Sequence, residues 1–221
     1  QYKKNLSINS PHFPLHKIVF IPGVLQSPSM KQKVNSKYFR IVHTGNLYGL
    51  RNLEQFENAI NWIKENNPEV LMRIQFSLVG DLSSHNRKTA LRVSELVQTN
   101  IVGSRMSHVE TNDFCLNADL LLTIEAPLEN NPFFPSKILD YLAYPSPQLL
   151  ISRSGFLVDY LQDKQGFHVD SGEDSEALGL LILKLYNLWL SESLDSPTAE
   201  VCEFFSPIRI KRLLQRALEG M

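Results

Sequence analysis

Four residues near the middle of the chain could bind a phosphorylated sugar. Pro135, Ser136, Lys137 and Asp140 follow an apolar run over residues 120–124, which is typical of a buried parallel strand. Pro135 suits the first turn of a helix, so we expect a helix to begin there. The N–H groups of that turn, with Ser136 and Lys137, would attract a phosphate, and Asp140 could accept hydrogen bonds from sugar hydroxyls. The alternative is an ordinary capped surface helix.

A second candidate phosphate contact follows the predicted strand over residues 39–43. Gly45 and Gly49 permit a tight turn and a close approach of the backbone to a ligand. Arg51, expected at the start of the next helix, has a guanidinium that matches two phosphate oxygens. The sequence contains neither G-x-G-x-x-G nor the P-loop pattern, so this phosphate site would be of another type. A plain βα turn with a solvated Arg51 is the alternative.

A loop, a histidine and two glutamates near the predicted site have weaker support as functional residues. The loop Ser104-Arg105-Met106 follows a predicted strand and could contact the edge of a base, or it could be a plain loop before a helix capped by Ser107. His43 is expected in the core or at its rim. Glu125 and Glu129 are expected to be solvated loop residues, and no general base stands out.

Composition limits the class of protein. The chain has 221 residues, 43% of them hydrophobic and 20% charged, as in ordinary globular proteins. The net charge of −1 offers no overall attraction for nucleic acid. The two cysteines, Cys115 and Cys202, have no metal-ligand spacing, so neither a disulfide framework nor a metal site is predicted.

The order of patterns predicts an α/β fold. Apolar strand-like runs alternate with helical patterns of ten or more residues, which excludes hairpins and favours a doubly wound parallel sheet with helices on both faces. In such a sheet, ligands bind beyond the carboxyl ends of the strands, where the candidate residues would meet. Residues 26–37 resemble a linker, so we expect a boundary between residues 1–37 and a domain over residues 38–221.

Several segments together resemble the C-terminal half of GT-B glycosyltransferases of the large group 1 or family 4 type. The matching segments are Ile41-Val42-His43-Thr44-Gly45-Asn46-Leu47-Tyr48-Gly49-Leu50-Arg51, Phe76-Ser77-Leu78-Val79-Gly80-Asp81, Ala118-Asp119-Leu120-Leu121-Leu122 and Pro135-Ser136-Lys137-Ile138-Leu139-Asp140-Tyr141-Leu142-Ala143. Their order and spacing carry the resemblance, which covers about residues 17–218.

The resemblance implies that this Rossmann-like domain binds a UDP- or GDP-linked sugar for transfer to a polysaccharide or glycolipid. Gly45 and Arg51 would lie near the diphosphate, and Asn46 would be a further donor-binding residue. Ser104, Arg105 and Met106 would lie near the base, Ser136 and Lys137 near phosphate and sugar, and Asp140 near the ribose. The reaction would be hexosyl transfer without a bound metal or other cofactor. Residues 1–37 would be the end of an N-terminal acceptor domain, so we expect this chain alone to bind donor without turnover.

The sequence departs from the family pattern in two places. The family has two glutamates with seven residues between them, but Asp140 occupies the second position and Pro132 the first. Glu129 is near enough in the sequence to supply the missing carboxylate contact with the donor sugar. Asn46 and Asn52 stand where basic residues are common. A nucleotide-sugar epimerase of the same fold and a non-catalytic interaction domain therefore remain alternatives.

The resemblance implies a cytoplasmic protein. A peripheral contact with the cytoplasmic face of the membrane stays open, because Arg209, Lys211, Arg212 and Arg216 make the last predicted helix basic.

Overall fold

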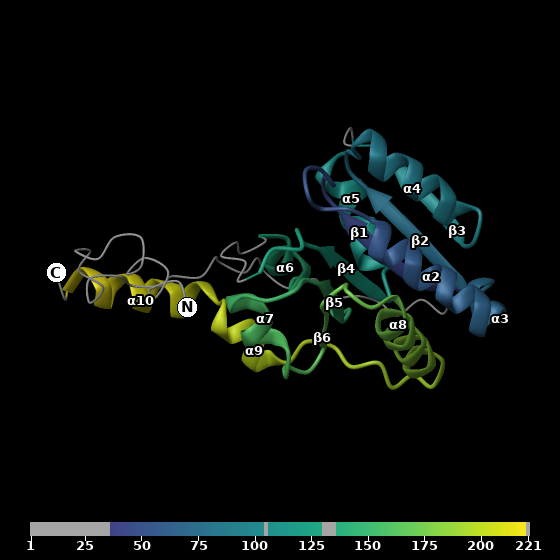
Figure 1. Cartoon of the computed structure of the whole chain (residues 1–221). Helices are drawn as coiled ribbons and strands as arrows, with labels where there is room; N and C mark the ends of the chain where they lie inside the picture. The colour runs from purple at the N-terminus through teal and green to yellow at the C-terminus, as the bar shows by residue number, and fades with distance from the viewer. Residues whose placement is uncertain (1–35, 104–105, 130–135, 220–221) are drawn as a thin grey trace.

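The computed structural model describes residues 36–103, 106–129 and 136–219. The strands are β1 Phe39–Thr44, β2 Ile74–Val79, β3 Gln98–Val102, β4 Leu120–Ile124, β5 Gln148–Ile151 and β6 Phe167–Asp170. The helices are α2 Glu54–Asn66, α3 Pro68–Leu71, α4 Ser84–Ser94, α5 His108–Leu116, α6 Ser136–Tyr141, α7 Phe156–Leu161, α8 Ser175–Leu190, α9 Ala199–Phe204 and α10 Pro207–Glu219. Figure 1 shows their arrangement.

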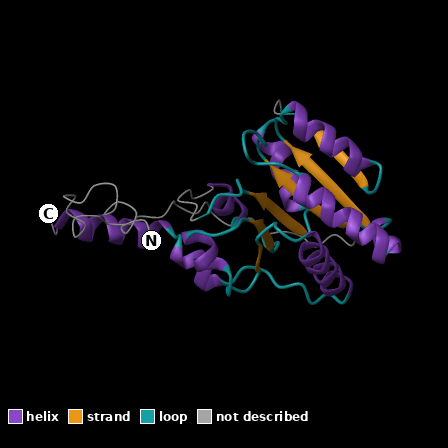
Figure 2. Ribbon diagram, in the orientation of Figure 1, coloured by secondary structure: helices purple, strands orange, loops and turns teal. Residues whose placement is uncertain are grey.

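The strands of the described residues form one parallel sheet in the order β3-β2-β1-β4-β5-β6. The order reverses between β1 and β4, as in a doubly wound fold, and this confirms the predicted fold class. Figure 2 shows the strands lying between helices. The loops that leave the carboxyl ends of β1 and β4 therefore start side by side.

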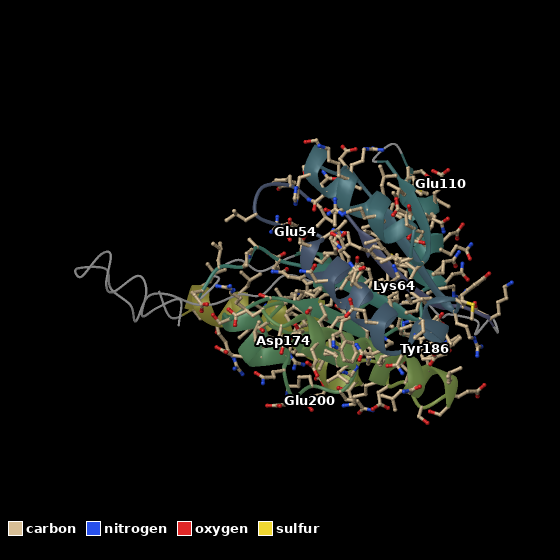
Figure 3. The ribbon with its side chains drawn as sticks, turned by 45° about the vertical axis from the view of Figure 1, so that its right-hand side comes forward. Glu54, Lys64, Glu110, Asp174, Tyr186 and Glu200 are labelled. Carbon is tan, nitrogen blue, oxygen red and sulfur yellow. The ribbon has the colours of Figure 1, made fainter. Side chains whose placement is uncertain are left out.

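Helices cover both faces of the sheet because alternate strand residues point to opposite sides. The larger core packs α2, α4 and α8 against one face, and α5, α6 and α7 cover the other with α9 beside α7. Tyr186 of α8, labelled in Figure 3, meets the ring of Phe39 at 6.1 Å between centroids. Helix α8 thus returns to strand β1 and closes the main core.

A charged clamp fixes the amino end of β1 to the turn before β4. The carboxylate of Asp119 accepts hydrogen bonds from the backbone N–H and the side-chain Nε of Arg40, each at 2.9 Å. A third bond joins Arg40 Nη2 to Asp119 at 3.2 Å. The clamp fixes the register of the two strands whose opposite ends carry the candidate site.

Most predicted elements are confirmed, with differences at their boundaries. Helix α4 begins at Ser84 because the side chain of Ser83 caps it by accepting a hydrogen bond from the backbone N–H of Asn86. Helices α3 and α9 were not predicted, since each is too short to show a periodic pattern. The predicted linker and the domain boundary at residue 37 lie almost entirely outside the described residues.

Helix α10 extends away from the sheet in Figure 1. Ile210, near its start, is buried, but Leu214 and Leu218 are 44% and 65% exposed. Arg209 folds back over the ring of Phe204 at 3.8 Å and donates to its carbonyl. The helix is thus anchored at its first turns, and its apolar side is exposed farther on.

Truncating Phe39 tests the closure by α8. Phe39→Ala should lower the free energy of unfolding by about 3–5 kcal/mol, because the ring is fully buried and contacts Tyr186 and Trp189. Urea denaturation measures the loss. Met72→Ala is the control, since Met72 is 75% exposed, and equal losses in the two variants would contradict this account of the core.

Candidate functional site

Two glycines let the loops after β1 and β2 approach each other at the carboxyl edge of the sheet. Gly45 and Gly80 have φ angles of 111° and 140°, which L side chains rarely adopt. A Cβ on Gly80 would lie 2.4 Å from the carbonyl oxygen of Gly45. A Cβ on Gly45 would lie 1.8 Å from Nζ of Lys137. The predicted meeting of Lys137 with the first glycine loop is therefore confirmed.

Lys137 is half-buried in this position. Burial lowers the pKa of its ammonium, and the carboxylate of Asp140 acts in the opposite direction. Ser136 and Asp140, on the same short helix, are exposed. Pro135 lies outside the described residues. The edge thus has a cation held against glycine backbone, with a hydroxyl and a carboxylate beside it.

Asn86 of α4 fixes the shape of the loop that carries Arg51. Its Nδ2 donates to the carbonyls of Leu47 and Arg51 at 3.1 and 2.9 Å, and its Oδ1 accepts from the backbone N–H of Leu53 at 2.9 Å. The side chain is 1% exposed. Arg51 lies in this loop, whereas we expected it at the start of the helix, which begins only at Glu54.

Asn46 has a role within the same two loops. Its Oδ1 accepts a hydrogen bond from the backbone N–H of Asp81 at 2.9 Å. The next residue, Leu47, donates its N–H to the carbonyl of Asp81 at 2.9 Å. Asn46 thus joins the loop after β1 to the loop after β2, and its part in donor binding stays a prediction.

Arg51 and Glu125 form an ion pair between the loops after β1 and β4. Oε2 of Glu125 accepts from Nη2 of Arg51 at 3.0 Å and from Nε at 3.3 Å. The expectation that Glu125 is solvated is wrong, because its side chain is 5% exposed and that of Arg51 is 28% exposed. Hydrogen bonding to Glu125 raises the pKa of Arg51. The pair places a fixed cation at the sheet edge.

Tyr141 and His43 form a buried floor below these loops. The hydroxyl of Tyr141 accepts a hydrogen bond from the N–H of Thr44 at 2.8 Å. His43 Nδ1 lies 2.9 Å from the carbonyl oxygen of Leu122, which accepts only, so this nitrogen carries the proton. Burial, helped by nearby Lys137, lowers the pKa of His43 to about 3. His43 is therefore a neutral core residue, as expected.

Glu129 is exposed, and Arg153 and Ser154 contact its carboxylate. Its carboxylate accepts from Arg153 at 3.4 Å and from the hydroxyl of Ser154 at 3.3 Å. Arg153 also pairs with Glu173 at 3.1 Å. The structure thus places Glu129 between the loops after β4 and β5, and its predicted contact with the donor sugar stays a prediction.

The proposed base-binding loop lies partly outside the described residues. Ser104 and Arg105 belong to that part, and Met106 is partly buried. Ser107 caps α5 in a reciprocal arrangement with Glu110, which Figure 3 labels. The alternative of a helix capped by Ser107 is therefore confirmed for Ser107 itself.

Three buried residues of the site were missed by sequence reasoning. Asn86 looks like an ordinary helix residue, Tyr141 like part of an apolar helix face, and Glu125 like a solvated loop acid. The sequence signal that bears on Asn86 is Ser83, a residue type that caps helices. It places Asn86 in the first turn of α4 but does not reveal the partners of its side chain. The contacts of all three with the loop after β1 depend on tertiary structure.

Comparison with solved structures identifies the fold. Anabaena HepE, solved with UDP and glucose, superimposes with a TM-score of 0.63 at 13% identity, over 84% of this chain and 49% of HepE. The C-terminal domain of the group 1 glycosyltransferase LpcC from Francisella tularensis matches with a TM-score of 0.55 at 12% identity, over 76% of this chain and 88% of that domain. The chain has the GT-B glycosyltransferase fold.

A further GT-B structure matches nearly the whole chain. The lipopolysaccharide outer core galactosyltransferase WaaB covers 99% of this chain at 14% identity, with a TM-score of 0.61, and 59% of WaaB is matched. The chain spans 37% of TarM and 49% of HepE. No protein-family profile matches the sequence, and no curated protein matches it either. The likeness therefore rests on GT-B architecture.

Neither a membrane-spanning helix nor a cluster of metal ligands occurs among the described residues. No helix in residues 36–103, 106–129 or 136–219 is long and apolar enough to cross a bilayer. Within the same ranges, no three His, Cys, Asp or Glu residues gather where they could share a metal ion. The metal-independent reaction stays a prediction.

Replacing Asn86 by Asp tests the support of the loop. The new carboxylate would place an oxygen against the carbonyls of Leu47 and Arg51, leaving both without a donor. We expect a loss in unfolding free energy of about 1–3 kcal/mol for each unsatisfied group, measured by urea denaturation. Asn52→Asp is the matched control, because the side-chain oxygen of half-buried Asn52 accepts from the N–H of Glu54 and its Nδ2 donates only to the solvent-exposed carbonyl of Leu50. A cost no larger than that of the control would contradict the assignment.

The pKa of His43 gives a prediction for acid stability. The unfolded chain protonates His43 near pH 6.5, whereas the folded pKa lies near 3, so stability is present above pH 6.5 and falls as pH drops toward 3. His43→Leu should make this decline shallower, by up to about 1.4 kcal/mol per pH unit. Urea titrations between pH 7 and pH 4 measure it. A slope in His43→Leu equal to that of the unaltered chain would contradict the burial of a neutral imidazole.

Proposed function

We propose that this chain forms the donor half of a glycosyltransferase and binds the diphosphate of a UDP- or GDP-linked sugar. The observation that carries the proposal is the convergence of Lys137 and Arg51 on the glycine loop after β1. Glu125 holds Arg51 before any ligand arrives, and Nζ of Lys137 already lies beside Gly45. The complex of HepE with UDP and glucose, on the same fold, supports the choice of ligand.

The chemistry of glycosyl transfer suits this arrangement. When the bond between the anomeric carbon and the diphosphate breaks, negative charge develops on the leaving phosphate oxygen. Fixed cations in a partly dehydrated place stabilise such charge without reorganising, which is the largest contribution in many enzymes. Lys137 and Arg51 would supply that stabilisation, and Asp140 would orient the ribose through its hydroxyls.

A non-catalytic interaction domain is a second candidate, favoured by two contacts. The side chain of Asn46 is bonded to the backbone of Asp81, and Glu129 is engaged by Arg153 and Ser154. These side chains hold loops together where the family has basic and acidic ligands. A domain kept for its architecture alone would bind no nucleotide.

Calorimetric titration with UDP and GDP separates the two candidates. A lone donor domain with a dissociation constant near 1 mM corresponds to about −4 kcal/mol, so concentrated protein is needed. Lys137→Met should weaken binding of the preferred nucleotide by about tenfold or more, because charge-assisted hydrogen bonds are worth about 1.5–3 kcal/mol. Asp140→Asn should weaken the nucleoside diphosphate but not inorganic pyrophosphate.

Lys64→Met is the matched control for charge. Lys64, which is labelled in Figure 3, lies in the last turn of α2. This variant removes the same charge and should leave binding unchanged. Equal losses in Lys64→Met and Lys137→Met, or no binding of either nucleotide by the unaltered chain, would contradict the proposed donor site.

A further inference from the structure

The buried carboxylate of Glu125 pairs with Arg51 and would not itself bind a diphosphate. It lies directly after β4, and its N–H donates to the carbonyl of Ile151 at 3.0 Å, so its backbone is part of the sheet edge. The residue is 6% exposed. Burying a carboxylate is costly unless it is paired and hydrogen-bonded. A buried negative charge beside an anion site would also repel the ligand, so its position calls for a compensating role.

The geometry of the contact suggests that role. Glu125 engages Nε and Nη2 of Arg51, which is one edge of the guanidinium. An arginine has five N–H donors in a rigid planar fork, so fixing one edge also fixes the direction of the remaining donors. The side chain of Arg51 is 28% exposed, which leaves part of it accessible to a ligand.

The other end of Arg51 is fixed as well. Asn86 donates to its carbonyl at 2.9 Å, and the ring of Tyr48 lies 5.9 Å from the guanidinium carbon. A free arginine loses side-chain entropy when it binds a ligand, and this loss weakens binding. An arginine held at both ends has lost that freedom during folding.

We propose that Glu125 is a positioning residue that holds Arg51 in the orientation required to bind the donor diphosphate. This role rests on the proposed donor function. It gives a prediction whose sign is opposite to that of simple electrostatics. Removing a negative charge near an anion site should tighten anion binding through Coulomb's law. If Glu125 positions Arg51, removing it weakens binding.

The test compares Glu125→Ala and Glu125→Gln with the unaltered chain in titrations with UDP and GDP. Glu125→Ala should weaken binding of the preferred nucleotide about three- to tenfold, as expected for an arginine that must be ordered on binding. The affinity of Glu125→Gln should lie between those of Glu125→Ala and the unaltered chain, because the amide oxygen of the glutamine still accepts a hydrogen bond from Arg51. Circular dichroism at the titration temperature shows that each variant is folded.

Glu57→Gln is the matched control for losing a buried carboxylate. Glu57 is 8% exposed and pairs with Arg92, joining α2 to α4. Its loss removes the same charge and a similar ion pair, so an effect that comes only from lowered stability would appear here too. We expect Glu57→Gln to bind the nucleotide as the unaltered chain does.

The Nε–H resonance of Arg51 in a ¹⁵N NMR spectrum reports the contact without any nucleotide. Its exchange with water should be slow in the unaltered chain and fast in Glu125→Ala, and equal exchange in both would overturn the role. Nucleotide binding that is unchanged or tighter in Glu125→Ala would overturn it while leaving the donor function standing. No binding of either nucleotide by the unaltered chain would overturn the donor function, and this role with it.

Discussion

The candidate site depends on the close approach of Gly45 to Gly80. The carbonyl oxygen of Gly45 occupies the space that a side chain on residue 80 would need, and Nζ of Lys137 occupies the space beside Gly45. Any larger residue at either position would separate the loops after β1 and β2 or displace the lysine. The bonds from Asn46 to Asp81 and from Leu47 to Asp81 form only at this separation. One backbone contact therefore determines where the cations of the site can lie.

The topology of the sheet explains why residues distant in sequence meet there. Strand β1 lies between β2 and β4, so the loop after β1 contacts the loops that follow both neighbours. Asn46 joins it to the loop after β2, and Arg51 joins it to Glu125 after β4. The clamp between Arg40 and Asp119 fixes β1 and β4 at the opposite end. One ion pair thus joins β1 and β4 at their amino ends, and the other joins the loops that follow their carboxyl ends.

Much of the architecture could be predicted because its signals are local. The alternation of apolar strand-like runs with longer helical patterns predicted the parallel sheet and the helices on both its faces. The convergence of Gly45 with Lys137 followed from the rule for the carboxyl ends of parallel strands. Glu125 could not be predicted in this way, because its burial depends on an arginine 74 positions earlier in the chain. The role of Asn86 could not be predicted for the same reason, because its hydrogen-bond partners lie 33 to 39 positions away in the sequence.

The hydrogen bonds between Asn86 and residues 47–53 restrict the motion of the loop after β1. Loops that bind ligands usually belong to the least stable parts of a protein and open by themselves. Here the loop after β1 shares buried hydrogen bonds with α4, so it cannot open without exposing Asn86 and disturbing that helix. Fluctuations of the loop are therefore coupled to those of the second βα unit. A ligand reaching this edge would meet a rigid surface, and selectivity would come from fit to a fixed shape.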